Sequence, residues 1–290
     1  MSYRARKRTK TDINADVLVA AIQFGLRGSE LKKVSRMNHR RSTKQMLVDT
    51  TFNVHTDARG GDPDSTSPTL RSYHKFLWSK PLPSGATFEL TDQKKGVYLY
   101  HSSGLGEYFF GSDAITHSYK NHKRKKWFTE HIQHEVNELF DAGSTIGAFT
   151  LFPNNRIDRQ HTINQARGVN GLIDDRFDLT LECIRRFYLG QESPLYGTLL
   201  RYKSFFHLFE SFEGYFKYFL LDDLVGENQQ VIFYLPFDDF KTAPRFSRIE
   251  EYSIYKKGVM NFIRSRNTRI ETYVKQRAVE TPECCSRPKP

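Results

Sequence analysis

The chain of 290 residues is long enough to bury a substantial hydrophobic core, as one large domain or two smaller ones. Apolar residues make up 38% of it and aromatic residues 14%, a composition typical of folded proteins and not of disordered chains. No apolar run approaches the roughly 18 residues that span a bilayer, and the chain does not begin with the pattern of a secretory signal peptide. The sequence therefore predicts a folded cytoplasmic protein without membrane contact.

The formal net charge of +11 invites a nucleic-acid interpretation, but its distribution along the chain argues against a basic domain. Residues 1–45 contain 12 Lys/Arg and 3 Asp/Glu, whereas the remaining 245 residues contain 32 Lys/Arg and 30 Asp/Glu. One run, KNHKRKK at 120–126, supplies five of those later positive charges. The basic character therefore belongs to an N-terminal arm and one loop, and the rest of the chain is nearly neutral.

We predict three parts: a basic arm at 1–46, a single α+β domain at 47–275 and a flexible tail at 276–290. The arm contains a short helical pattern, ADVLVAAIQFGL, after candidate N-cap residues. It is either an arm that touches polyanions or sequence upstream of a true start at Met37 or Met46.

In chain order, strand patterns dominate the first half and helix patterns the second. Strands are expected at 48–54, 87–90, 97–101, 107–112, 145–152 and 230–237. Helices are expected at 68–78, 127–140, 172–188, 194–221 and 247–275. The clearest helix start has Ser67 as its cap and Pro68 at the first helical position. The fold class is α+β, with a mixed or antiparallel sheet largely from the first half packed by helices largely from the second.

The predicted helix at 172–188 carries its charges on one arc and its apolar residues on another. Acids precede arginines along it, which suits the helix dipole, and Glu182 can pair with Arg185 and Arg186. Such a pattern is typical of the solvated side of a buried helix. Arg176 is different, because it projects from the apolar arc. A buried arginine needs an anionic partner, from protein or ligand, since unpaired burial costs several kcal/mol.

The polar stretch FPNNRIDRQHTINQARGVNG at 152–171 lies just upstream and precedes a helix start. Backbone amides at a helix start and neighbouring arginines can together bind an anion. Histidine is suited to proton transfer because its pKa lies near neutral pH. The predicted site has one acid or base and four residues that hold or orient an anion: His161, Arg156, Asn164, Arg167 and Arg176. The alternative is an ordered polar loop whose side chains cap nearby backbone.

Three other groups are weaker candidates. The segment SYHKFLWSK at 72–80 is either an aromatic stacking surface or core, and the aromatic repeat in 205–221 is typical of a buried helix stripe. Asp238 and Asp239 follow a predicted strand, and they either line a functional site or form a turn.

Several kinds of site have no support in the sequence. His131 and His134 lie three residues apart on a predicted helix, with no third metal ligand in view. The three cysteines, at 183, 284 and 285, fit neither a disulfide framework nor zinc spacing, which agrees with a reducing cytoplasm. Glycine-rich phosphate loops, dinucleotide fingerprints and serine-hydrolase elbows are also lacking. We therefore expect no metal and no cofactor.

Several long motifs resemble an uncharacterised bacterial family that is classed only as a domain of unknown function. They are SPTLRSYHKFLWSKPLPSG, TIGAFTLFPNNRID, TINQARG, DRFDLTLECIRRFY and YLPFDDF, in this order. The resemblance covers roughly residues 48–270 and places the basic arm outside the shared domain. It implies no activity, so it assigns no catalytic residue.

Two functions are compatible with these patterns. The first is binding of a phosphate-bearing ligand, a nucleotide or RNA, with a metal-independent ribonuclease as the concrete form and His161 as its acid or base. The second is a non-catalytic interaction protein whose basic arm and KNHKRKK loop contact polyanions.

Overall fold

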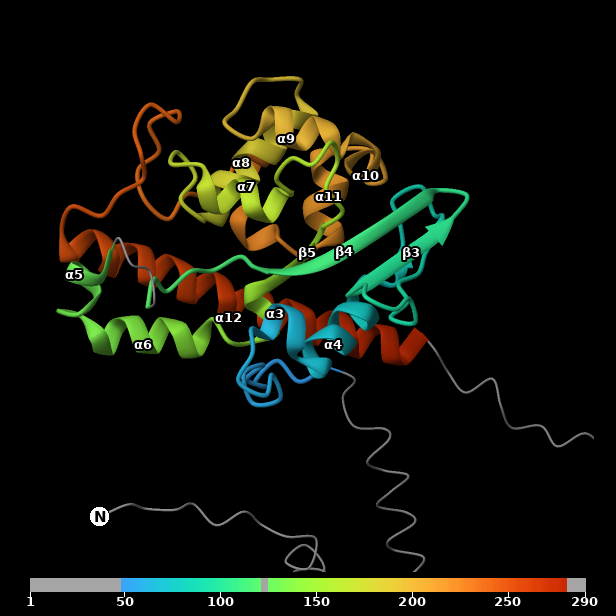
Figure 1. The fold of residues 1–290 in the computed structure, drawn as a ribbon, viewed down its shortest axis with the longest axis horizontal. Coiled ribbons are helices and arrows are strands. Elements are labelled where there is room, and N and C mark those ends of the chain that lie inside the picture. Colours follow the sequence, from blue (N-terminus) through green and yellow to red (C-terminus); the bar gives the residue numbers. More distant parts are fainter. Residues whose placement is uncertain (1–47, 121–124, 281–290) are drawn as a thin grey trace, which may run out of the picture. The chain divides into compact units, whose positions relative to one another are not determined.

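The computed structural model describes residues 48–120 and 125–280 (Figure 1). The strands are β1 (Lys80–Pro81), β2 (Thr87–Phe88), β3 (Leu99–Ser103), β4 (Gly106–Ala114) and β5 (Phe149–Pro153). The α-helices are α3 (Pro63–Thr66), α4 (Pro68–Trp78), α5 (Lys126–Thr129), α6 (Gln133–Ala142), α7 (Ile163–Val169), α8 (Phe177–Tyr188), α9 (Tyr196–Arg201), α10 (Lys203–His207), α11 (Phe212–Tyr218) and α12 (Ile249–Glu280). Short 3-10 turns lie at Ile146–Ala148, Asp222–Leu224 and Glu227–Gln229.

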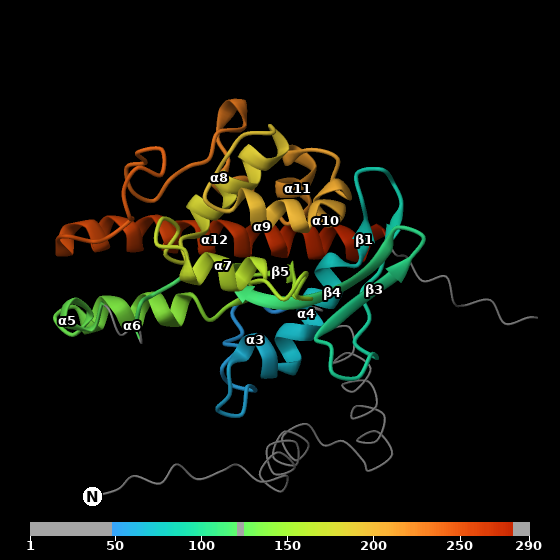
Figure 2. The same cartoon turned by 45° about the horizontal axis from the view of Figure 1, so that its top comes forward.

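The main sheet is antiparallel, with strand order β3-β4-β5. Leu99 pairs with Phe110 across β3 and β4, and Gly111 pairs with Phe152 across β4 and β5. The strands β1 and β2 form a separate two-stranded ribbon. The helices α7 to α11 lie on one side of the strands, and α3 and α4 on the other, in both views of the ribbon (Figures 1 and 2). The predicted α+β class is confirmed, with an antiparallel sheet from the first half and helices largely from the second.

The start of α4 is confirmed as predicted. The Ser67 hydroxyl accepts a hydrogen bond from the Leu70 backbone N–H at 3.1 Å, and Pro68 occupies the first helical position, where no intrahelical N–H is needed. Its face buries Tyr73, His74 and Trp78, so the segment 72–80 belongs mainly to the core.

Two predicted strands are wrong, and side chains explain both. At 48–54 the carboxylate of Asp49 accepts the Thr51 backbone N–H at 2.9 Å, and this local bond favours a turn over a ladder. At 230–237 pairing is limited to an isolated bridge between Val231 and Val225. The Tyr234 backbone N–H is donated to the Asp178 carboxylate at 3.0 Å, so it is not available to a neighbouring strand.

Four predicted helices differ in extent. The helix expected at 127–140 is broken into α5 and α6, and the one expected at 194–221 is broken into α9, α10 and α11. The helix expected at 172–188 begins only at Phe177. Asp174 and Asp175 precede it with φ of 48° and 61°, in the left-handed region, which a continuous helix excludes. In the other direction, α12 continues to Glu280, past the predicted end at Lys275.

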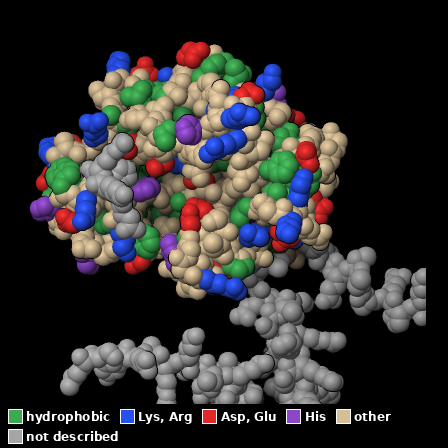
Figure 3. Space-filling model, viewed as in Figure 1, with side chains coloured by type: hydrophobic (Ala, Val, Ile, Leu, Met, Phe, Trp, Pro, Cys, Tyr) green, Lys and Arg blue, Asp and Glu red, His purple; other side chains and the backbone are tan. Residues whose placement is uncertain are grey.

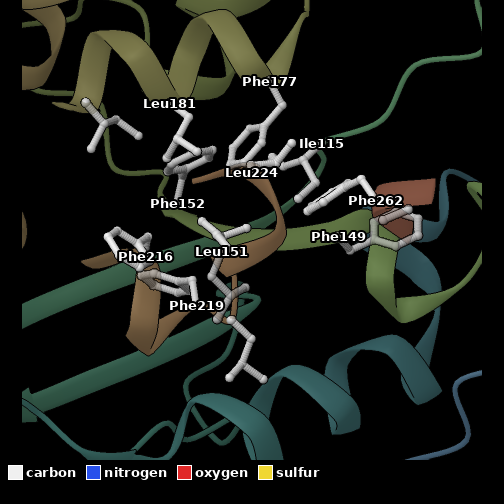
Figure 4. Packing of buried hydrophobic residues seen from close by; sticks show 14 of the residues in the cluster. Ile115, Phe149, Leu151, Phe152, Phe177, Leu181, Phe216, Phe219, Leu224 and Phe262 are labelled. Atoms are coloured by element: carbon white, nitrogen blue, oxygen red, sulfur yellow. The ribbon is translucent and has the colours of Figure 1, made fainter. Parts of the chain in front are cut away.

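The hydrophobic core lies between α8, the sheet and the segments around α11 and α12 (Figure 4). Phe177 and Leu181 of α8 point toward Phe152 of β5. The aromatic repeat of 205–221 contributes as predicted, and the six phenylalanines of this segment are all buried: Phe205, Phe206, Phe209, Phe212, Phe216 and Phe219.

The long helix α12 is tied to the sheet by Arg266, which is fully buried. Its guanidinium donates to the backbone carbonyls of Gly147 at 3.0 Å, Phe149 at 2.9 Å and Phe219 at 2.9 Å. One side chain therefore joins α12 to the start of β5 and to the chain after α11. Burial lowers the pKa of Arg266 to about 9.

Acidic and basic side chains are interspersed on the face shown in Figure 3, in agreement with the near-neutral composition of this part of the chain. The predictions for the arm at 1–46, for positions 121–124 of the basic run and for 281–290 fall outside the described residues. Among the described helices, none is long and apolar enough to cross a bilayer.

Candidate functional site

Arg176 is buried at the N-cap of α8 and meets a carboxylate of the protein itself. Its Nε donates to Asp178 Oδ1 at 3.1 Å, and Nη2 donates to Asp178 Oδ2. Because Asp178 also accepts the Tyr234 backbone N–H, this fork joins α8 to the segment after Val231. Of the two partners that the sequence left open for Arg176, a protein carboxylate or a ligand, the structure provides the carboxylate of Asp178.

Arg167 is also buried and fully engaged. Its Nη1 contacts the Asp113 carboxylate of β4, Nε donates to Thr180 Oγ1 at 2.9 Å, and Nη2 donates to the Asp175 carbonyl at 3.1 Å. This second predicted anion ligand is a structural link between α7, β4 and α8.

The charges of α8 are less solvated than the helix pattern indicated. Asp178 and Glu182 are buried, because arginines neutralise both of them. Glu182 pairs with Arg185 at 2.7 Å and with Arg186 at 2.8 Å, as predicted from the spacing. Asp178 and Glu182 therefore stabilise the fold through ion pairs and do not belong to the solvent-exposed face of the helix.

The start of α7 is closed by its own residues. Thr162 Oγ1 accepts the Gln165 backbone N–H, and Gln165 Oε1 accepts the Thr162 backbone N–H, both at 3.3 Å. This capping box satisfies two of the backbone amides that are free at a helix start, those of Thr162 and Gln165. The side chains of the loop between β5 and α7 are therefore the main groups that it offers for binding.

Two predicted site residues do come together, in a shallow cleft of about 520 Å³ between this loop and the α7–α9 region. Arg156 and His161 line it with Arg159 and Arg201, and we call it the arginine cleft. Arg156, Arg159 and His161 are exposed, and Arg201 is half-buried.

The loop that carries these side chains is held at two points. Arg201 Nη2 donates to the His161 carbonyl at 2.9 Å, and the Tyr202 hydroxyl donates to the Asn155 carbonyl at 2.9 Å. The Nε of Arg201 is buried and has no hydrogen-bond partner among the described residues. The cleft is therefore built on a fixed backbone and keeps an unused donor.

Asn164 lies elsewhere, in a second cleft of about 580 Å³ that Arg156 also lines. Asp62, Asp64 and Arg71 line it too, and we call it the aspartate cleft. The five predicted residues are thus divided among two clefts and two buried ion pairs.

Arg71, Asp64 and Arg201 were missed by sequence reasoning. Asp64 and Arg71 lie on the consecutive helices α3 and α4, whereas Arg201 lies much later in the chain on α9, and no local motif connects the three. The polarity of Arg201 between apolar helical residues was the one signal in the sequence.

The remaining candidates from the sequence are two histidines and two aspartates on the surface of the protein. His131 and His134 are exposed near the break between α5 and α6. Asp238 accepts the Lys241 backbone N–H at 3.2 Å, and the exposed Asp239 pairs with Arg186, which is typical of a turn. Within residues 48–120 and 125–280, no group of three or more His, Cys, Asp or Glu side chains could hold a metal ion.

The fold and its clefts define an α+β domain with two adjacent polar clefts on either side of α7. The model of a family of unknown function, DUF6994, matches residues 48–270. The chain belongs to this family, as the motifs had indicated. Neither a curated protein nor a solved structure matches the chain.

Proposed function

We propose that the arginine cleft binds a phosphate-bearing ligand of the nucleotide or RNA class. One observation carries this proposal: Arg156, Arg159, Arg201 and His161 share the cleft, and none of its described lining residues is Asp or Glu. Guanidinium groups match phosphate oxygens with paired, charge-assisted hydrogen bonds. An anion entering this cleft meets attraction without a competing carboxylate.

The geometry favours binding over cleavage. RNA cleavage through the 2′-hydroxyl needs a base and an acid, and His161 is the one histidine among the lining residues, with no carboxylic acid beside it. The ribonuclease form of the proposal therefore depends on His161 alone. It stays the narrower version of the function, with Arg156 and Arg159 holding the phosphate.

The test is charge reversal in the cleft. Arg156→Glu with Arg159→Glu is compared with a control, Arg248→Glu with Lys257→Glu, which makes the same charge change at exposed positions of or next to α12. Fluorescence anisotropy with a short labelled oligouridylate should show binding weakened about tenfold or more in the cleft variant, ~1.4 kcal/mol. The salt dependence of binding should also decrease. Equal binding by the two variants overturns the proposal.

Two further variants separate the alternatives. His161→Ala should abolish any RNA cleavage while leaving the anisotropy signal intact; wild-type protein without cleavage ends the ribonuclease version. Deletion of residues 1–45 tests the interaction-protein alternative. If that deletion removes all affinity and the cleft variant removes none, the arm is the polyanion contact.

A further inference from the structure

The aspartate cleft differs in chemistry from the arginine cleft, because it contains charges of both signs. Asp62 and Asp64 come from the start of α3, Arg71 comes from α4, and Arg156 reaches it from the loop after β5. None of these four side chains forms an ion pair within 4.0 Å with another described residue. The buried acids Asp113, Asp178 and Glu182 are all paired. The cleft thus keeps opposite charges apart.

Asp64 is held in place by a chain of hydrogen bonds whose direction can be assigned. Trp78 Nε1, which can only donate, bonds to His74 Nδ1 at 2.9 Å. His74 Nε2 lies 3.0 Å from Ser112 Oγ, and Ser112 Oγ lies 2.6 Å from Asp64 Oδ1. Burial lowers the pKa of His74 to about 3, so the ring is neutral and its one proton is on Nε2.

This direction decides what each residue can do. His74 donates to Ser112, so it cannot take the proton of that hydroxyl, and Ser112 is not an activated nucleophile. The Ser112 hydroxyl donates its hydrogen bond to Asp64 Oδ1. The relay therefore ends on an oriented carboxylate that borders the cleft, and Asp64 is the residue that it positions.

Arg71 is positioned for the opposite charge. Its guanidinium carbon lies 4.8 Å from the centre of the Tyr98 ring, which fixes the side chain by a cation–π contact. Its Nε is buried and has no hydrogen-bond partner among the described residues. A buried donor left unpaired is costly, so an acceptor from a ligand would stabilise it.

From this arrangement we propose that the aspartate cleft binds a small zwitterion of the amino-acid class, with its ammonium at Asp64 and Asp62 and its carboxylate at Arg71. A purely anionic ligand would be repelled by the two carboxylates, and a purely cationic one by the two arginines. The volume of about 580 Å³ leaves room for a side chain, and Asn154 and Gln165 offer it amide contacts. This site is separate from the proposed phosphate site and shares only Arg156 with it.

The protonation of Asp64 gives this site a dependence on pH. Burial and the Asp113 charge raise the pKa of Asp64 to about 7, and Asp62 acts in the same direction. An ammonium binds the ionised carboxylate, so affinity should increase as pH rises from about 6 to 8. His55, His117 and Lys120 line a neighbouring cleft that Asp64 also borders, and Arg71, Arg156 and Tyr98 line its own, so a variant must identify the group that titrates.

The experiment uses isothermal titration of the full chain with the standard amino acids, one by one at millimolar concentration. Each one that binds is compared with its decarboxylated amine and its deaminated acid. Asp64→Asn keeps the acceptor for Ser112 and removes the charge; Asp141→Asn removes a charge from an exposed position. We expect about tenfold weaker binding and a flat pH profile for Asp64→Asn only, and weaker binding of both truncated ligands.

Three outcomes would overturn the proposal. One is that no amino acid binds. Another is that Asp64→Asn binds as the wild type does, with the same pH profile. The third is that the amine or the acid binds as well as the amino acid. Arg71→Gln gives an independent check, since it should weaken amino-acid binding but strengthen amine binding, because it removes a positive charge that repels the amine.

Discussion

The arginines around α8 and those of the arginine cleft differ in what their guanidinium groups meet. Arg167 and Arg176 are buried against Asp113 and Asp178 and use their donors within the protein. Arg156 and Arg159 are exposed and form no ion pair with a described residue. A buried arginine in an apolar arc is thus evidence for an internal partner first. Of these four arginines, the two that remain available to a ligand are Arg156 and Arg159, in the loop between β5 and α7.

The largest expected effect comes from breaking the Arg176 fork. Asp178→Ala leaves a buried guanidinium without its carboxylate and the Tyr234 N–H without its acceptor, so we expect a loss of about 3–5 kcal/mol in the free energy of unfolding. Urea denaturation measures it. The double variant Arg176→Met with Asp178→Ala should recover part of the loss; a change below about 1 kcal/mol for Asp178→Ala would contradict the comparison.

Arg266 is a third buried arginine, but its hydrogen-bond partners are backbone carbonyls and not a carboxylate. It therefore tests whether a buried arginine stabilises the fold without an ion pair. Arg266→Met leaves three buried carbonyls without their donor, at about 1 kcal/mol each, so we expect about 3 kcal/mol of destabilisation. The control is Arg269→Met, which removes the more exposed ion pair with Asp223 and should cost less than about 1 kcal/mol. Thermal unfolding measures the loss of stability in both variants. Similar losses for Arg266→Met and Arg269→Met would refute the special role of Arg266.

A smaller effect is expected at Asp64, through its charge. The pKa of Asp64 is about 7 in the folded protein, whereas an aspartate in the unfolded chain has its ordinary pKa of 3.8. The folded protein therefore binds this proton more tightly than the unfolded chain does. The stability from this group is therefore greatest at low pH and is lost as pH rises from about 4 to 7. Asp64→Asn should increase stability at pH 8 by on the order of 1 kcal/mol and leave it nearly unchanged at pH 4. Unfolding curves across this range decide it, and a stabilisation that does not depend on pH would assign the effect to another cause.

The smallest effect is expected in the arginine cleft. Arg156→Ala and Arg159→Ala remove exposed side chains without ion pairs, so each should change the free energy of unfolding by less than about 0.5 kcal/mol. Chemical denaturation of these variants, beside Asp178→Ala, makes the contrast a direct measurement. A large loss for either one would show that the loop arginines are structural as well.

Local signals predicted much of the fold. Ser67 and Pro68 located the start of α4 because capping depends on neighbouring residues alone. The strands at 48–54 and 230–237 were predicted wrongly because β-branched composition says nothing about which donors are used elsewhere. The Tyr234 N–H is taken by Asp178, a residue 56 positions earlier in the chain, and no local pattern records that bond.

The site was harder to predict than the fold. Periodicity identified Arg176 as buried, but its partner two residues away was assigned to the solvated arc, since a helix wheel assumes that the helix has already begun there. Arg156 and His161 were found together because they belong to one loop. Asp64, Ser112 and His74 are joined by tertiary contacts between α3, β4 and α4, which spacing along the chain does not encode.

The position of Arg266 also has a consequence for how the protein is made. The ribosome adds this residue 119 positions after Gly147 and 47 after Phe219, whose carbonyls it finally satisfies. A nascent chain that ends before α12 must leave those acceptors to water or to another molecule. Completion of the domain is therefore a late event in synthesis, and stalled or truncated products should be the forms most exposed to chaperones and proteases.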